Sequence, residues 1–284
     1  MENIRQALER ARALGSGGAG RTDRAGSNAG RRQLEADHGV VNGQSRAVAL
    51  DLRHLESQRI IAHDETDFRA KSFDMLRTQV LQSMDQKNWK ILGVTSPSPG
   101  CGKTLTAVNL ALSIARQPER SALLVDLDLQ KPQIANCLGL DCSAGVVSVL
   151  RGQTSLSNAV IGAEISACQL LVLPAEISTS DSSAWMTSRS MSTLLQDIKR
   201  EYPSYTVIVD LPPMLSSDDV IAVLPQLDCV LLVAAVGKST VAEIEECNSH
   251  LQSAQVVRLV LNKVPRSNTA YYYYSSYLPR PRAV

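Results

Sequence analysis

The segment from residue 91 to residue 111 constrains the fold more than any other part of this 284-residue chain. It begins with a short apolar run, Ile91 to Thr95, and continues through a loop of Ser, Pro and Gly. It ends in Gly102-Lys103-Thr104, followed by apolar residues at helical spacing. Because such loop residues interrupt regular structure, the segment predicts a strand, a loop and a helix in that order. This order is the context in which a P-loop binds phosphate.

The residue types of this loop suit the binding of an anion. Gly100 and Gly102 allow the backbone to turn its N–H groups inward. The start of the helix adds unpaired N–H groups and the positive end of the helix dipole. We therefore expect Lys103 to reach the outer phosphates of a nucleotide and the Thr104 hydroxyl to bind magnesium.

Two features weigh against a simple motif match. Pro97 stands where the general motif has its first Gly, so a chance Gly-Lys-Thr between a strand and a helix is the alternative. A second match to the ending, Gly237-Lys238-Ser239, has Leu232 at the position of the first Gly and lacks a glycine-rich loop. We interpret this second match as an ordinary strand-to-helix loop.

Composition narrows the class of protein. The hydrophobic fraction of 44% and the net charge of +1 are typical of one sizeable α/β domain with appendages, and they give no general case for nucleic-acid binding. The longest apolar run, residues 229–236, is far short of the ~20 residues that a membrane span needs. The charged start indicates no secretory signal, and the six scattered cysteines lack a C-x-x-C pair, which together favour a reducing cytoplasm.

The chain divides into four predicted segments. Residues 1–14 read as a short helix, and residues 15–47, rich in Gly, Ala, Arg and Ser, as a flexible linker. Residues 48–265 form the predicted P-loop domain, in which a helix over about 66–86 precedes the first strand. Residues 266–284 form a tyrosine-rich C-terminal tail.

Five further apolar runs follow the P-loop and alternate with helical or loop stretches. They are Ala122–Val125, Leu170–Leu173, Thr206–Val209, Cys229–Ala235 and Val256–Leu261. Continuous apolar strands that alternate with helices predict a parallel sheet buried on both faces. The predicted fold is therefore α/β and P-loop NTPase-like, with a mostly parallel β-sheet flanked by helices on both faces.

Carboxylates follow two of these strands directly. Asp126 and Asp128 come after the second predicted strand, and Asp210 after the fourth. Ligands of parallel sheets bind at the carboxyl ends of the strands, and a magnesium–nucleotide site needs carboxylates there. The alternative for each residue alone is an ordinary loop position or helix cap.

The tail carries most of the tyrosines of the chain. Of 7 tyrosines, five lie close together near the C-terminus: Tyr271, Tyr272, Tyr273, Tyr274 and Tyr277. Pro-Arg sequences flank this cluster on both sides, unlike a buried segment. We interpret the cluster as a peptide that offers phenol hydroxyls as substrates. An aromatic edge strand or a partner-binding tail is the alternative.

These motifs resemble the bacterial tyrosine kinases of capsule and exopolysaccharide assembly, the BY-kinases. The segment 96–104 matches their S-x-x-P-G-x-G-K-[ST] loop, which explains the Pro in place of Gly. The segment 123–132 matches their strand ending D-x-D before basic residues and Pro, with Gln130 where Arg is usual. The segment 207–213 matches their strand ending in Asp before x-P-P. The resemblance covers about residue 67 to the end.

The resemblance implies roles for individual residues, with ATP and Mg²⁺ as cofactors. The nucleotide-binding residues that it implies are Pro99, Gly100, Cys101, Gly102, Lys103, Thr104, Leu105 and Asn262. Thr104, Asp128 and Asp210 would hold the magnesium ion, and Asp126 would accept the tyrosine proton. Together with Lys103, these three aspartates are the predicted catalytic group. In related enzymes the position of Asn262 contacts the adenine.

The resemblance also implies a function and partners. The chain would be an ATP-dependent protein-tyrosine autokinase that phosphorylates Tyr271–Tyr274 and Tyr277 of another copy and regulates polysaccharide polymerisation and export. Its partners would be the cytosolic tail of a membrane-embedded polysaccharide co-polymerase, which activates it, a second copy of itself and a phosphotyrosine phosphatase, with no nucleic acid. It would be cytoplasmic and recruited to the inner face of the plasma membrane by its partner.

One departure concerns assembly, and two other functions remain as alternatives. The family helix before the P-loop often reads E-x-x-R-x-x-R and joins subunits into a ring, but here the positions hold Lys71, Asp74 and Arg77, so two charges are reversed. A positioning ATPase of the chromosome-partition or division-site kind would have a Lys at Ser98 and no tyrosine tail. The other alternative is a non-catalytic, nucleotide-gated scaffold of the polysaccharide machinery.

Overall fold

The computed structural model describes residues 46–165, 168–253 and 256–265. The predicted N-terminal helix, nearly all of the predicted linker and the tyrosine cluster lie outside these ranges. Within the described residues, no helix combines the length and the apolar character that crossing a lipid bilayer requires.

The described chain alternates between strands and helices. The strands are β1 (Arg46–Ala49), β2 (Ile91–Thr95), β3 (Ser121–Asp126), β4 (Ile161–Ile165), β5 (Cys168–Leu173), β6 (Tyr205–Asp210), β7 (Cys229–Ala235) and β8 (Val256–Asn262). The α-helices are α2 (Leu52–Ser57), α3 (Lys71–Lys87), α4 (Lys103–Ala115), α5 (Ile134–Leu138), α6 (Val146–Leu150), α7 (Leu156–Ala159), α8 (Ser182–Met186), α9 (Arg189–Glu201), α10 (Asp219–Val223) and α11 (Val241–His250). The 3₁₀ turns are η1 (Phe68–Ala70), η2 (Leu224–Gln226) and η3 (Leu251–Ser253).

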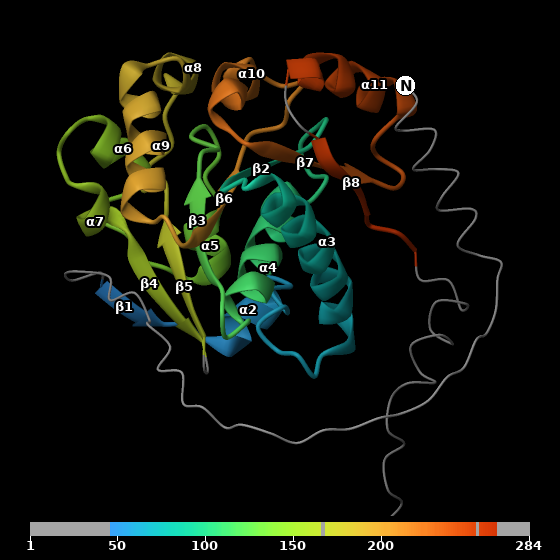
Figure 1. The fold of residues 1–284 in the computed structure, drawn as a ribbon, viewed down its shortest axis with the longest axis horizontal. Helices are drawn as coiled ribbons and strands as arrows, with labels where there is room; N and C mark the ends of the chain where they lie inside the picture. The colour runs from blue at the N-terminus through green and yellow to red at the C-terminus, as the bar shows by residue number, and fades with distance from the viewer. Residues whose placement is uncertain (1–45, 166–167, 254–255, 266–284) are drawn as a thin grey trace, which may run out of the picture. The chain divides into compact units, whose positions relative to one another are not determined.

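All eight strands belong to one sheet with the order β1-β4-β5-β3-β6-β2-β7-β8 (Figure 1). Every neighbouring pair is parallel except β4 and β5, which are antiparallel. The predicted mostly parallel sheet is therefore confirmed. β1 and β4 are absent from the predicted strands, and β1 takes in residues 46 and 47, which lie in the predicted linker.

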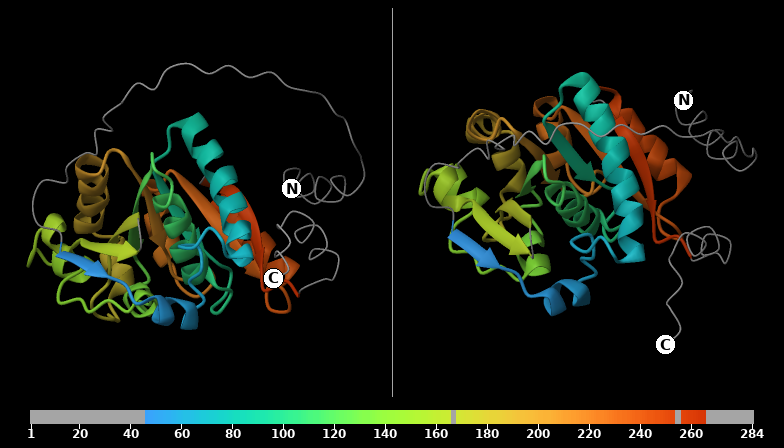
Figure 2. Two further views of the ribbon diagram at one scale, coloured as in Figure 1. Left: turned by 90° about the horizontal axis from the view of Figure 1, so that it is seen from below. Right: turned by 60° about the horizontal axis from the view of Figure 1, so that its bottom comes forward.

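The strands alternate their side chains between two separate cores. On one face, Leu92, Leu124 and Ile208 pack with apolar residues of α2, α3, α4 and α5. Helices α3 and α4 lie side by side on this face (Figure 2). On the other face, Leu123 and Val209 pack with residues of α6 to α11. The sheet is thus covered by helices on both faces. Because its central strands are buried on both sides, they appear in the sequence as continuous apolar runs.

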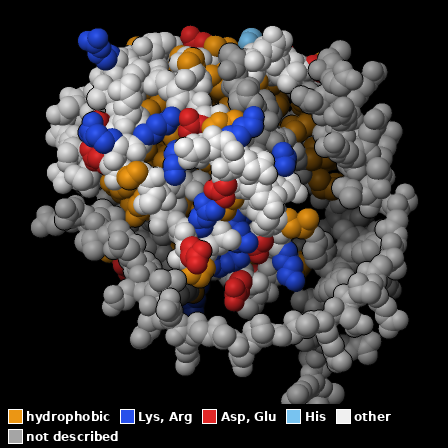
Figure 3. Space-filling model, in the orientation of Figure 1, with side chains coloured by type: hydrophobic (Ala, Val, Ile, Leu, Met, Phe, Trp, Pro, Cys, Tyr) orange, Lys and Arg blue, Asp and Glu red, His pale blue; other side chains and the backbone are white. Residues whose placement is uncertain are grey.

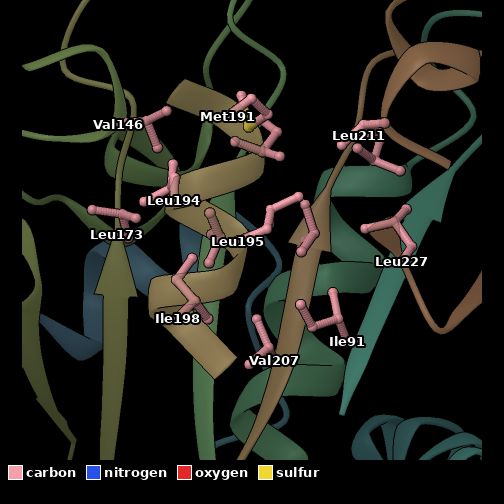
Figure 4. Packing of buried hydrophobic residues seen from close by; sticks show 14 of the residues in the cluster. Ile91, Val146, Leu173, Met191, Leu194, Leu195, Ile198, Val207, Leu211 and Leu227 are labelled. Atoms are coloured by element: carbon pink, nitrogen blue, oxygen red, sulfur yellow. The ribbon is translucent and has the colours of Figure 1, made fainter. Parts of the chain in front are cut away.

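Helix α9 shows how one amphipathic helix covers the second face. Met191, Leu194, Leu195 and Ile198 recur at a spacing of three or four residues and all are buried. They lie between β5 and β6 in the view of Figure 4 and belong to the same buried cluster as Leu173 and Val207 of these strands. Ser188 caps the helix by accepting a hydrogen bond from the N–H of Met191 at 3.1 Å. This packing fixes the strand ends that carry the polar residues of the site.

Candidate nucleotide site

The P-loop joins the end of β2 to the start of α4, as the sequence predicts. Gly100 has φ of +76° and Gly102 has φ of +94°, both in the left-handed region that residues with a side chain rarely adopt. A Cβ on Gly102 would also collide with Nδ2 of Asn262. Glycine is therefore required at this position twice over, by conformation and by space. The resulting loop forms a concave cradle at the N-terminus of a 13-residue helix.

Lys103 is the first residue of α4, and two carboxylates face its ammonium group. Its Nζ lies 2.8 Å from Oδ2 of Asp128 and 3.3 Å from Oδ2 of Asp210. The hydroxyl of Thr104 donates to Oδ2 of Asp210 at 2.6 Å. Lys103 is 9% exposed, Asp128 5% and Asp210 0%. The structure thus brings together the four residues that we predicted for the phosphates and the metal.

The charges at this point are not balanced, because three buried aspartates surround one lysine. Burial alone would lower the pKa of Lys103, but Asp210 and Asp128 outweigh it and hold the pKa above its ordinary value. Burial, with the lysine opposing it, raises the pKa of Asp210. Burial and the neighbouring Asp210 raise the pKa of Asp126 to about 8. The crowding of carboxyl groups that raises these pKa values is relieved when a divalent cation binds beside them.

The donor set fits Mg²⁺ in particular. It consists of hard oxygen atoms, one hydroxyl and two carboxylates, from Thr104, Asp128 and Asp210. In the part of the chain that the structure describes, no cluster of three or more His, Cys, Asp or Glu side chains could enclose an ion by itself. Mg²⁺ usually keeps several waters and takes phosphate oxygens as further ligands, so a partial protein shell is what it needs.

Asp126 occupies a different place from the other two aspartates. Its side chain is 0% exposed and does not line the cavity of the site. One oxygen accepts from the N–H of Asp128 at 3.2 Å, and the other accepts from the N–H groups of Gln133 at 3.1 Å and Ile134 at 3.0 Å. In this conformation Asp126 fastens the loop from β3 to α5. Its role as the proton acceptor stays a prediction.

A cavity of about 310 Å³ opens beside these residues. Six of its lining residues were assigned roles from the sequence: Pro99, Gly100, Gly102, Lys103, Thr104 and Asp128. Sequence analysis predicts no role for the other seven, which are Gln130, Lys131, Gln133, Pro212, Pro213, Ser216 and Ser217. These seven residues belong to the D-x-D and D-x-P-P motifs or follow them within five residues. The two motifs therefore indicate in the sequence which loops line the cavity.

Gln130, which replaces the usual Arg, is held in place by a buried acid. Its Nε2 donates to the hydroxyl of Ser182 at 2.9 Å and to Oδ2 of Asp219 at 3.2 Å. Asp219 is 0% exposed, and its Oδ1 has no hydrogen-bond partner among the described residues. These bonds connect the loop after β3, whose Gln130 lines the cavity, to α8 and α10.

The other predicted nucleotide-binding residues, Cys101, Leu105 and Asn262, lie in or beside the P-loop but do not line the cavity. Asn262 donates from Nδ2 to the carbonyl oxygen of Cys101 at 2.9 Å, so the end of β8 reaches the P-loop. Cys101 is fully buried, and Leu105 packs against the apolar core beneath the helix. The predicted contact of Asn262 with adenine stays a prediction, as do the roles of Tyr271–Tyr274 and Tyr277, which lie outside the described residues.

Comparison with known proteins agrees with this geometry. An AAA domain family matches residues 89–256, more than half of the chain. Tyrosine-protein kinase ptk of Acinetobacter johnsonii is 26% identical over 207 residues, which is 72% of this chain and 28% of the relative. Tyrosine-protein kinase CpsD of Streptococcus pneumoniae serotype 4 is 28% identical over 74% of this chain and 92% of the relative.

Solved structures give the same result. The crystallised kinase domain of VpsO superposes with a TM-score of 0.61 at 27% identity, over 69% of this chain and 97% of that domain. The resemblance to bacterial tyrosine kinases that we inferred from the motifs is therefore confirmed. The chain spans less than a third of the length of the first of these relatives, so their activity as whole proteins does not transfer directly.

Proposed function

The chain belongs to this AAA domain family, and from that premise we propose that it is an ATP-dependent protein-tyrosine kinase that acts on its own tail. One observation carries the proposal: Lys103, Thr104, Asp128 and Asp210 converge beside a glycine cradle and a cavity. The names of its relatives, which are tyrosine-protein kinases, support the choice of tyrosine as the acceptor.

The proposed chemistry assigns each of these groups a task. When bound, ATP supplies the phosphoryl group and Mg²⁺ the charge that neutralises it. The N–H groups of the cradle and the ammonium of Lys103 bind the phosphates, and Thr104, Asp128 and Asp210 hold the metal. Because phosphoryl transfer has a loose transition state, positioning and charge neutralisation contribute more than removal of the phenol proton.

An incoming phenol hydroxyl has a pKa of ~10 and arrives protonated. Of the three predicted catalytic aspartates, Asp128 is the one that lines the cavity. Asp126 is fully buried, does not line the cavity and already accepts from three backbone N–H groups, so it is less accessible to the phenol than Asp128 is. We propose the tyrosine cluster Tyr271–Tyr274 and Tyr277 as the acceptor, presented by a second copy of the chain.

The tail provides the direct test of this function. The purified chain is incubated with magnesium-ATP and an activator tail, and the phosphorylated residues are mapped by mass spectrometry. Phosphate should map to the five tyrosines and disappear when all five are changed to Phe. Tyr205→Phe is the matched control, because this half-buried tyrosine at the start of β6 lies outside the tail and should leave the phosphorylation unchanged.

The same experiment separates the alternatives. Robust ATP turnover without phosphotyrosine in the tail would favour a positioning ATPase, although Ser98 stands where such proteins carry Lys. Nucleotide binding without turnover would favour a scaffold. We further propose that the activator is the cytosolic tail of a membrane-embedded polysaccharide co-polymerase. Binding to this tail would recruit the chain to the inner face of the membrane. A phosphotyrosine phosphatase would reverse the reaction. Regulation of polysaccharide polymerisation and export would follow from this cycle.

Helix α3 corresponds to the helix that joins subunits into rings in related kinases, but here its Asp74 forms ion pairs and a hydrogen bond within the same chain. Oδ1 of Asp74 lies 3.0 Å from Nη1 of Arg77 and 2.5 Å from Nη2 of Arg116, and it accepts from the hydroxyl of Ser113 at 2.7 Å. These partners all belong to α3, the end of α4 and the residue after it. Oδ1 of this carboxylate is thus already engaged within its own subunit, and Lys71 has the charge opposite to the usual one.

We therefore expect the chain alone to be a monomer or to associate weakly at physiological salt. The Asp74→Asn variant should have the same molar mass in solution as the parent chain. The variant should lose roughly 1–3 kcal/mol of unfolding free energy, because two arginines that are 14–16% exposed lose their partner. Asp85→Asn is the control, since its more exposed pair with Arg120 contributes little. Light scattering and urea unfolding measure both quantities, and a stable ring of the parent chain would contradict this expectation.

A further inference from the structure

The two sides of the P-loop carry opposite charges. In the sheet, β2 lies between β6 and β7, with β3 and β8 as the next strands outward. On the β6 and β3 side, Asp210 and Asp128 face Lys103. On the β7 and β8 side, the residues that follow the strands include Lys238 and Lys263, and both ammonium groups reach the loop. This polarity gives a bound phosphate chain a direction.

Lys238 lies against the first glycine of the loop. Its Nζ is 2.7 Å from the position that a Cβ on Gly100 would take. The space that this glycine leaves is therefore the space that the ammonium group approaches. Lys238 is exposed and forms no ion pair with a described residue. Its charge is thus available to an anion held in the cradle.

The turn that carries Lys238 is built onto the P-loop. Gly237 has φ of +73°, and the N–H groups of Lys238 and Ser239 both donate to the carbonyl oxygen of Ala235, at 3.2 and 2.9 Å. The hydroxyl of Ser239 accepts from the N–H of Ala235 at 3.0 Å and lies 3.4 Å from Sγ of Cys101. Gly237-Lys238-Ser239 is therefore no second P-loop, as we inferred from the sequence, but it contacts the first one directly.

Lys263 acts on the backbone of the loop. Its Nζ donates to the carbonyl oxygen of Gly100 at 2.8 Å, next to the bond from Asn262 to the carbonyl oxygen of Cys101. These two bonds engage carbonyl oxygens of the loop. They hold the loop backbone without using the N–H groups that would bind the anion.

We propose that Lys238 is a second phosphate-binding residue, which contacts the phosphates nearer to the base, and that Lys263 is a positioning residue that holds Gly100. The metal and the outer phosphate belong on the side of Asp128 and Asp210. The rest of the nucleotide then extends toward β7 and β8, where Lys238 is a cation without an ion-pair partner among the described residues. This inference rests on the proposed nucleotide-dependent function.

The test uses ADP in the presence of EDTA, so that neither catalysis nor the metal contributes. Calorimetry should show the dissociation constant of Lys238→Ala raised by about tenfold, as for the loss of one charge-assisted contact at an exposed site. Lys238→Arg should bind like the parent. The matched control is Lys90→Ala, which removes an exposed lysine at the opposite end of β2. Binding by Lys238→Ala should also respond less to added salt.

Lys263 is tested by rescue. Lys263→Ala should weaken ADP binding, and Lys263→Arg, which keeps a donor for the carbonyl oxygen of Gly100, should restore most of it. If Lys238→Ala and Lys90→Ala both bind within twofold of the parent, the inference is overturned while the proposed function stands. A parent chain that binds ADP neither in EDTA nor with Mg²⁺ would overturn both.

Discussion

Lys103→Ala should abolish measurable nucleotide binding, with the dissociation constant for magnesium-ATP rising by roughly 100-fold or more. Lys103 is the cation at the start of α4, and its ammonium group is within 3.3 Å of the carboxylates that hold the metal. Without it, Asp128 and Asp210 repel the phosphates with no compensation. A charge-assisted contact contributes about 1.5–3 kcal/mol, and the added repulsion increases this loss.

The free protein should respond as well. Removing one partner of a buried ion pair leaves uncompensated charge, so Lys103→Ala should unfold at a lower temperature than the parent. Lys199→Ala is the control, because this lysine also pairs with an aspartate, Asp228 at 2.8 Å, at the start of β7. It should bind magnesium-ATP normally in calorimetry. Parent-like affinity of a folded Lys103→Ala would show that the P-loop assignment is wrong.

The strands that the sequence predicted are those with continuous apolar character. β2 and β7 have the predicted bounds, and β3, β5, β6 and β8 differ from them only at their ends. β2, β3, β5, β6 and β7 are largely buried on both faces, and both faces therefore select apolar residues. The edge strand β8 keeps an apolar run although Leu259 and Leu261 are 45% and 57% exposed. The residues of β4 include Gly162 and the exposed Glu164, and β1 has four residues, so neither strand carries such a signal.

The site shows a similar division between local and distant information. Lys103, Thr104 and the three aspartates are recognisable because each follows a strand in a fixed local pattern. The enclosure of Asp126 by backbone N–H groups depends on the path of the loop from β3 to α5, which the motif does not specify. The approach of Lys238 to Gly100 depends on β7 lying next to β2. Only the sheet order reveals that contact.

Asp210→Asn should remove most of the effect of magnesium on nucleotide binding. In the parent, Asp210 repels the phosphates when no metal is present and attracts them through the metal when it is bound. The variant should therefore bind ADP as tightly as the parent or more tightly in EDTA, but gain about tenfold less from added Mg²⁺. Asparagine can still accept from Thr104 and Lys103, so the fold of the loop should persist.

Two titrations by calorimetry, with Mg²⁺ and with EDTA, measure this difference for each protein. Asp228→Asn serves as the matched control, because Asp228 also accepts from a lysine and from backbone N–H groups at a strand end but does not line the cavity. It should keep the full response to magnesium. If Asp210→Asn instead gains as much from Mg²⁺ as the parent, the metal is held by other groups, and the proposed division between the acidic and basic sides of the P-loop loses its main support.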